Sequence, residues 1–339
     1  MNITKTNKET KNSLTKKATA FAVISVLAVS IFAGNLMTLQ AMADSGNNTH
    51  TNTSSNAGST NEKQTARQTL RQTLQQDQVT YKQAVQTADL TYKQAVQTAQ
   101  LAHSQSVRDA NTAYNQAVKQ AQTAYNGAVN AAHGNAATIG QAMATRDQAI
   151  AAAKTAQINA VVAADVTRDK AVNEAWLTHE NTVYAALATR DGADGTAQSA
   201  FYTAIGNATL ATRSQTIGQA HVTADNSILQ ARQTRITAVE TADVTKDQAI
   251  GSARTAYITA ESTAHIALDN AYTKDSKAWN LALQSYWNSV APLTQTQDSA
   301  IATANANHVS AVGIADATRD QAIDQAYATM YGSISAAYS

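Results

Sequence analysis

The sequence predicts an all-α protein of long helices, arranged either as an elongated coiled-coil-like rod or as an antiparallel helical bundle. Two observations predict this class. Ala, Thr and Gln dominate the 339 residues, which include one Pro, no Cys and only 5% aromatic residues. Ala and Gln favour helix, while large apolar side chains are too few for one or two ordinary globular cores. The second observation is a repeat of eleven residues.

The repeat is clearest in Thr80–Leu101, which reads TYKQAVQTADLTYKQAVQTAQL, and it continues through most of the remaining chain. Eleven residues in three turns give about 3.67 residues per turn, close to the 3.6 of a relaxed helix. A strict period of eleven therefore keeps one face of a long helix in line with little supercoiling. We call this unit the hendecad and number it from its Thr.

Hendecad positions 2, 5, 6 and 9 lie within about 100° of one another around the helix and form a broad stripe of Ala, Val, Ile and Tyr. Position 11 lies nearly opposite and is often aliphatic. A helix that is apolar on two sides requires neighbours on two sides. The position-11 residues are Leu90, Leu101, Val166, Leu177, Val222, Val244 and Ile266. The candidate helix-contact residues are Tyr81, Val85, Tyr92, Val96, Ile150, Val172, Ile250, Trp279, Tyr286 and Ile323.

Residues 1–43 have the features of a signal peptide. Five lysines precede the apolar run Ala18–Ala33, and the small-x-small sequence Ala41–Ala43 predicts cleavage between Ala43 and Asp44. The long basic segment resembles signal peptides of Gram-positive bacteria such as lactobacilli. The alternative is an uncleaved membrane anchor, although the apolar run is slightly short for a span.

The remaining chain divides into a spacer and a repetitive region. Residues 44–61 are rich in Ser, Thr, Asn and Gly and predict a disordered spacer, whose hydroxyl groups are possible O-glycosylation sites. Residues 62–339 predict a repetitive α-helical region with breaks near 134–140, 191–195 (DGADG) and 291–292 (Ala-Pro). The expected helices are at about 62–132, 141–190, 196–290 and 296–336.

The recurring TRDQ segments, at Thr145–Gln148 and Thr318–Gln321, match the capping box of a helix start. No loop residues precede these copies, so we favour positions inside helices, with Thr189 before DGADG as the least certain copy. Adjacent Arg and Asp residues, such as Arg168 and Asp169, do not face each other on a helix. They are expected to form rows that pair with a neighbouring helix.

Four histidines, His179, His221, His265 and His308, recur at intervals near four hendecads. On one helix they are about 65 Å apart, too far to share a metal. They are interpreted mainly as incidental sequence variation among the hendecads. Two alternatives are a hairpin that brings some of them together and an interface that loosens on protonation near pH 6.

No motif for phosphate binding, nucleophilic catalysis or zinc-dependent hydrolysis occurs in the sequence. The sequence therefore predicts no catalytic residue, no cofactor-binding residue, no metal ligand and no enzymatic activity. Loss of five lysines and Glu9 with the signal peptide leaves a formal charge of −3. This near balance argues against nucleic acid as a partner.

Self-association or folding back is expected, because a lone helix with one strong aliphatic position per unit cannot offset its ordering entropy. The first functional hypothesis is a secreted, non-enzymatic structural or interaction protein of the bacterial cell surface or matrix: a spacer, adhesin or assembly component. Its expected partners are other copies of itself and cell-wall or host surface components, with extracellular or loosely wall-associated localisation. A membrane is not expected to be a partner.

Two resemblances bear on this hypothesis. Composition, export signal and helicity resemble the Ala-rich helical surface proteins of Gram-positive bacteria, whose stalks display or mediate contact. The period of eleven alone is similar to that of late-embryogenesis-abundant proteins, apolipoproteins and synucleins. That likeness implies the alternative function, an amphipathic protein that associates with lipid or protects against stress. The chain departs from it because Lys is sparse at the edges of the apolar face.

Overall fold

Four long helices make up most of the chain that this computed structural model describes, residues 56–339 except 274. They are α2 (Asn56–Ala131), α3 (Ala136–Ala204), α4 (Ala208–Asn270) and α5 (Ser276–Tyr338). Residues 56–339, apart from 274, contain no strand, and the all-α class predicted from the sequence is confirmed. At ~1.5 Å per residue, each helix is about 95–115 Å long.

The expected signal peptide 1–43, with its cleavage site between Ala43 and Asp44, lies outside the described residues. The expected spacer 44–61 overlaps the structure at its end. There the prediction of disorder is wrong, because α2 begins at Asn56 and includes the last residues of that segment. The segment 56–61 contains no Pro, so the helix can extend into it.

Three short turns separate the helices, and an Asn or Asp side chain caps the helix that follows each turn. Asn135 accepts a hydrogen bond from the Thr138 amide at 3.2 Å, and Asn207 accepts one from the Leu210 amide at 3.0 Å. Asp275 caps α5 in the same way. Gly134 and Gly206, which precede the two capping asparagines, have φ near +80°, a conformation that glycine adopts without strain.

Of the three breaks expected from the sequence, those at 191–195 and 291–292 are wrong, because both segments lie inside helices. The first turn, at 132–135, begins just before the break expected near 134–140. The second turn is at 205–207 instead of 191–195, because the DGADG segment continues α3 and its glycines allow a close helix crossing, described below. The expected boundaries of the second and third helices move accordingly. The TRDQ copies at Thr145 and Thr318 lie inside helices, as predicted.

The break expected at 291–292 is also wrong, since Pro292 lies inside α5 and the third turn is at 271–275. A proline in a helix interior costs about 3 kcal/mol. Packing on both sides holds the helix across it: Tyr286 and Val290 are buried before the proline, and Ala304 is buried after it. The capping Asp275 and the turn before it then provide the reversal of the chain.

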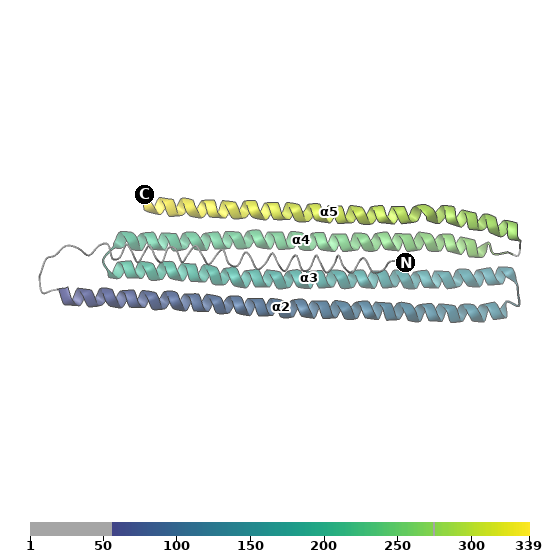
Figure 1. Cartoon of the computed structure of the whole chain (residues 1–339), viewed down its shortest axis with the longest axis horizontal. Helices are drawn as coiled ribbons and strands as arrows, with labels where there is room; N and C mark the ends of the chain where they lie inside the picture. Colours follow the sequence, from purple (N-terminus) through teal and green to yellow (C-terminus); the bar gives the residue numbers. More distant parts are fainter. Residues whose placement is uncertain (1–55, 274) are drawn as a thin grey trace. The chain divides into compact units, whose positions relative to one another are not determined.

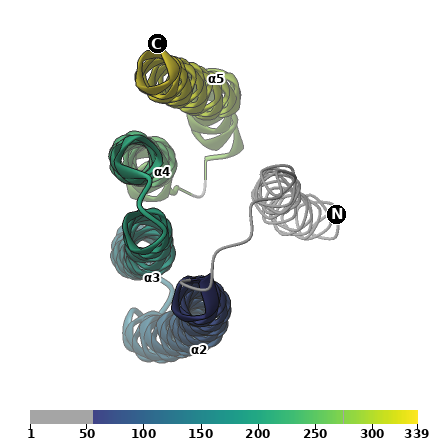
Figure 2. The same cartoon turned by 90° about the vertical axis from the view of Figure 1, so that its left-hand side faces the viewer.

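Residues 61–339 form one unit of the chain, in which the helices run antiparallel in the order α2, α3, α4, α5 (Figure 1). Seen end on, the four helices lie in a single row (Figure 2). α3 packs on α4 and α4 packs on α5, whereas the backbones of α3 and α5 make no contact. Side chains of α2 contact α3, as in the pair of His103 and Asp165, so α3 and α4 each have two neighbours, and α2 and α5 are the edge helices of this row.

Small residues line the contacts between the helices. On α2 the buried alanines recur every eleven residues, and similar series occur on α4 and α5. Alanine adds little hydrophobic free energy, but it lets two backbones approach closely enough for dispersion contacts to accumulate. The three series are Ala88, Ala99, Ala110 and Ala121 on α2, continued by Ala132 in the first turn; Ala220, Ala231 and Ala242 on α4; and Ala304, Ala315 and Ala326 on α5.

Within the described helices, no stretch is both long enough and apolar enough to span a lipid bilayer.

Candidate functional site

The candidate functional surfaces are the three contacts between neighbouring helices, which we call the α2–α3, α3–α4 and α4–α5 seams. In the α2–α3 seam, Asp89 binds His179 at 2.9 Å and His103 binds Asp165 at 2.8 Å. The second pair lies fourteen residues further along α2 and fourteen residues back along α3. The two helices therefore keep one antiparallel register between these contacts.

Cations of α3 stack on tyrosines of α2. The Arg146 guanidinium lies 4.7 Å from the centre of the Tyr125 ring, and the Arg190 guanidinium lies 4.8 Å from that of Tyr81. Each of these arginines also pairs with the next residue in sequence, as in the contact between Arg190 and Asp191. The prediction that adjacent Arg and Asp do not pair is therefore wrong. The long guanidinium group folds back over the neighbouring carboxylate when both are confined in a seam.

In the α3–α4 seam the two backbones approach each other closely at glycines. A Cβ atom built on Gly195 of α3 would lie 2.7 Å from the Cα of Gly218 on α4. A Cβ atom on Gly251 would lie 2.5 Å from a methyl group of Val162. Real Cβ atoms do not approach other carbon atoms so closely, so glycine is required for this spacing of the helices.

Carboxylates gather in the same seam. Burial and the nearby Asp191 carboxylate raise the pKa of Asp225 to about 7, and Arg190 lowers it only in part. Burial likewise raises the pKa of Asp194 to about 7, opposed by Arg190 and reinforced by Asp191 and by Asp77 of α2, toward which Asp194 also faces. Burial raises the pKa of Asp247 to about 6, opposed by Lys246. The seam therefore holds carboxyl groups that titrate close to neutral pH.

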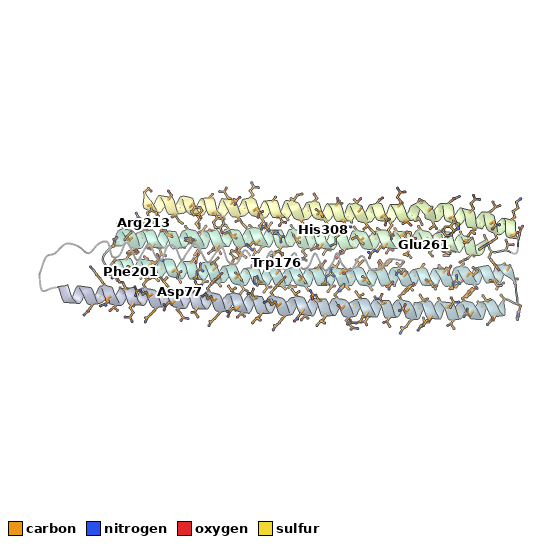
Figure 3. The ribbon with its side chains drawn as sticks, viewed as in Figure 1. Asp77, Trp176, Phe201, Arg213, Glu261 and His308 are labelled. Atoms are coloured by element: carbon orange, nitrogen blue, oxygen red, sulfur yellow. The ribbon has the colours of Figure 1, made fainter. Side chains whose placement is uncertain are left out.

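One buried carboxylate of this seam is well paired. Glu180 of α3, only 4% exposed, accepts a hydrogen bond from Arg232 of α4 at 3.2 Å and one from the Trp176 indole at 3.1 Å. Trp176 lies in the middle part of α3 (Figure 3). The guanidinium of Arg235 lies 5.0 Å from its ring centre. This group of residues joins α3 to α4 through both charge and ring contacts.

The α4–α5 seam repeats the pattern of the α2–α3 seam. His308 of α5 binds Asp243 of α4 at 2.7 Å, and Arg235 of α4 forms an ion pair with Asp316 of α5. Both Arg213 and His308 can be located in Figure 3, at different points along this seam. The Arg213 guanidinium lies 4.3 Å from the Tyr338 ring centre. All three seams therefore combine small apolar residues with charged pairs between helices.

The edge helices leave some of their large apolar side chains exposed to solvent. On α2, Leu90 is 60% exposed and Leu101 is 70% exposed. Both occupy hendecad position 11, whose members on α3 and α4 are all half-buried. On α5, Val309 is 70% exposed and Ile314 is 65% exposed. Aliphatic groups of one helical position are thus covered on the inner helices and open to solvent on α2.

Four of the ten predicted helix-contact residues contact another helix or a cluster that includes a residue of another helix. Tyr81 stacks under Arg190, and Tyr92 lies with its ring centre 5.8 Å from that of His179. Tyr286 is buried with Leu268 of α4, and Trp279 packs against this cluster. The remaining six predicted residues are half-buried on their helices: Val85, Val96, Ile150, Val172, Ile250 and Ile323.

Sequence reasoning missed the histidine–aspartate pairs, which the structure forms in all three seams. The interpretation of the histidines mainly as incidental sequence variation is corrected by these contacts, which the hairpin alternative anticipated in part. The turns carry the missing signal: two of them contain the dipeptide Gly-Asn, at Gly134-Asn135 and Gly206-Asn207. Folding the sequence back at these dipeptides aligns the histidines of one helix with the aspartates of the next.

One group of side chains could hold a metal ion. Asp147 of α3 and His265 and Asp269 of α4 each place a ligand atom within 4.8 Å of the other two. Across residues 56–339, leaving out 274, no other three His, Asp or Glu side chains meet that closely.

Comparisons of the chain with protein-family models, with curated proteins and with solved structures found no match.

Proposed function

We propose that this protein is a secreted, non-enzymatic structural protein of a bacterial cell surface or matrix, and that its helices associate laterally with those of other copies. One observation carries the proposal. The inner helices α3 and α4 cover both of their apolar sides, whereas α2 covers one side and exposes Leu90 and Leu101 on the other. A second copy is the occupant that fits this edge best, because the hendecad already packs against itself inside the chain.

The energetics favour such association. Full burial of one leucine side chain contributes roughly 1.5–3 kcal/mol. On α2, Val79, Leu90 and Leu101 form a short exposed row at one helical position, so gains from their burial would add together. Scattered apolar residues on a surface are common, but a row at a constant helical position is a contact surface. Export and cell-surface location rest on the sequence of residues 1–43 and are part of the proposal.

Lysine substitution of the α2 edge tests the proposal. The double variant Leu90→Lys/Leu101→Lys places two charges in the proposed interface, and we expect it to lower the mass of the species measured by light scattering. Gln83→Lys/Gln94→Lys is the matched control, since both glutamines are exposed on α2 and are also eleven residues apart. Wild-type protein that is monomeric at every concentration, or a control that dissociates equally, would contradict the proposal.

The same preparations separate this function from the lipid-associated or stress-protective alternative. We expect the wild-type chain to be strongly helical in plain buffer by circular dichroism. A chain that is coil in buffer and becomes helical only with phospholipid vesicles would favour the alternative and overturn our proposal.

A further inference from the structure

A cluster of three potential ligands lies in the α3–α4 seam. Asp147 comes from α3, and His265 and Asp269 come from α4, where a spacing of four residues places them on one face. The Nδ1 atom of His265 is 3.6 Å from Oδ2 of Asp147. All three ligand atoms lie within 4.8 Å of one another.

The Asp269 carboxylate lacks the partner that a buried charge requires. Its residue is only 2% exposed, and its Oδ2 atom is buried and accepts no hydrogen bond. The neighbouring Asp147 carboxylate carries the same charge, and His265 and Arg146 offset its repulsion only in part. Buried polar atoms are nearly always paired, and two carboxylates in contact repel unless a proton or a cation lies between them. The site therefore has the electrostatic character of a cation site.

Neighbouring side chains orient the other two ligands. Arg146 donates to Oδ1 of Asp147, which leaves Oδ2 turned toward His265. The Nε2 atom of His265 lies 2.9 Å from the hydroxyl of Tyr286 on α5. When Nε2 carries the proton and donates to this hydroxyl, Nδ1 presents a lone pair to the cluster. Metal-binding histidines are commonly oriented in this way, with the second ring nitrogen donating to a fixed group.

We propose that Asp147, His265 and Asp269 bind a divalent transition-metal ion such as Zn²⁺, which cross-links α3 to α4. One imidazole and two carboxylates suit such an ion, whereas Mg²⁺ and Ca²⁺ favour sites made only of oxygen atoms. Zn²⁺ bonds of ~2.0–2.1 Å in a tetrahedron place the ligand atoms about 3.3 Å apart. The 3.6 Å separation of His265 Nδ1 and Asp147 Oδ2 is close to this value. Small rotations of the Asp269 side chain would move its carboxylate oxygen from within 4.8 Å of these atoms to bonding distance of the ion.

A second copy of the motif shows what is special about this cluster. The segments Ala220–Asn226 and Ala264–Asn270 read AHVTADN and AHIALDN, so His221 and Asp225 repeat the spacing of His265 and Asp269. His221 faces Asp191 of α3, but their nearest charged atoms are 4.0 Å apart. Three ligand atoms do not converge within 4.8 Å there. The proposal is therefore confined to the cluster of Asp147.

Metal titration of the full chain tests the proposal. The chain, purified without a histidine tag and treated with a chelator, is titrated with ZnCl₂ by calorimetry and with CoCl₂ by visible absorbance. We expect one tight Zn²⁺ site per chain, a Co²⁺ spectrum typical of nitrogen and oxygen ligands, and a higher unfolding temperature with Zn²⁺. No binding of either ion by the wild-type chain would overturn the proposal.

Variants locate the site. Asp269→Asn and His265→Gln are each expected to weaken Zn²⁺ binding at least tenfold, and Tyr286→Phe to weaken it roughly tenfold. Asp269→Asn removes a buried charge, so it should retain the wild-type circular dichroism spectrum. His308→Gln is the matched control, because His308 also contacts an aspartate of a neighbouring helix, Asp243 of α4, but belongs to no three-ligand cluster. Equal affinity in Asp269→Asn and wild type would contradict the assignment.

Discussion

The crossing of Gly195 and Gly218 allows a sharp test of the α3–α4 seam. In Gly195→Ala the new Cβ atom would lie 2.7 Å from the Cα of Gly218 and 3.3 Å from the Ser214 carbonyl oxygen. Carbon atoms pack at about 3.5–4.0 Å, so the helices must separate by about 1 Å. Backbone atoms lie on both sides and cannot rotate away. Overpacking of this kind costs about 1–3 kcal/mol, partly offset by the better helix propensity of Ala.

Gly127→Ala is the matched control for this substitution. Gly127 also lies inside a helix, but a Cβ atom there would meet nothing within 4 Å. Replacing it should raise the free energy of unfolding by about 0.5–1 kcal/mol, because Ala favours helix over Gly. The same chemical change is therefore expected to have opposite signs at the two positions. The difference in unfolding free energy equals the overpacking cost of about 1–3 kcal/mol, because the gain in helix propensity is common to both.

Urea unfolding followed by circular dichroism at 222 nm, the usual helix signal, measures both variants against the wild-type chain. We expect the midpoint to fall for Gly195→Ala and to rise for Gly127→Ala. If Gly195→Ala were as stable as Gly127→Ala, the two helices would not cross at these glycines. The reasoning that places DGADG in a helix contact would then be refuted.

Three further predictions concern the seams. Asp194 and Asp225 have pKa values raised to about 7 in the folded chain, so their ionisation destabilises the fold as pH rises. The free energy of unfolding of chelator-treated protein should therefore increase by about 1.5 kcal/mol when the pH is lowered from 8 to 6.5. Urea titrations at each pH should show a smaller increase in Asp225→Asn, and a free energy of unfolding that does not change with pH would refute the assignment. Ile236→Ala should lower the free energy of unfolding by about 2–5 kcal/mol, since Ile236 is only 2% exposed. A variant that unfolds thermally at the same midpoint as the wild type would contradict the burial of Ile236. His308→Ala should lower the free energy of unfolding by about 1–3 kcal/mol, because it removes a hydrogen-bond partner of the buried Asp243. Amide hydrogen exchange in this variant should increase in α5 more than in α2.

The fold class and the packing face of α2 could be read from the sequence, because both follow from helix geometry. Tyr81, Val85 and Ala88 share one side of any helix with this repeat, and Leu90 lies on the other. The turns were harder to place. Gly192 and Gly195 have the local character of a break, whereas packing of Gly192 against Val222 and of Gly195 against Gly218 makes them part of a helix contact. Local composition alone does not distinguish these two uses of glycine.

The polar contacts were beyond sequence reasoning for a related reason. Whether His265 meets Asp147 depends on where the chain reverses, and an error of a few residues in the turn brings a different residue opposite. The prediction of no metal ligand rested on the wide spacing of the histidines along one helix and on the absence of a metal-binding motif. His265 and Asp269 supply only two ligands, and the third comes from α3. The proposed metal site therefore arises from the pairing of helices and has no signature in either segment by itself.

Lateral association through the edge helices is tested most directly by pulsed electron paramagnetic resonance. The chain has no cysteine, so Leu101→Cys and Val309→Cys each carry a single spin label on one edge. Our account predicts dipolar coupling between chains, in either labelled variant or in their mixture, that disappears on dilution with unlabelled protein. The label of Gln94→Cys, on the flank of α2, should show weaker coupling. Absence of dipolar coupling between chains in both Leu101→Cys and Val309→Cys, and in their mixture, would contradict the account.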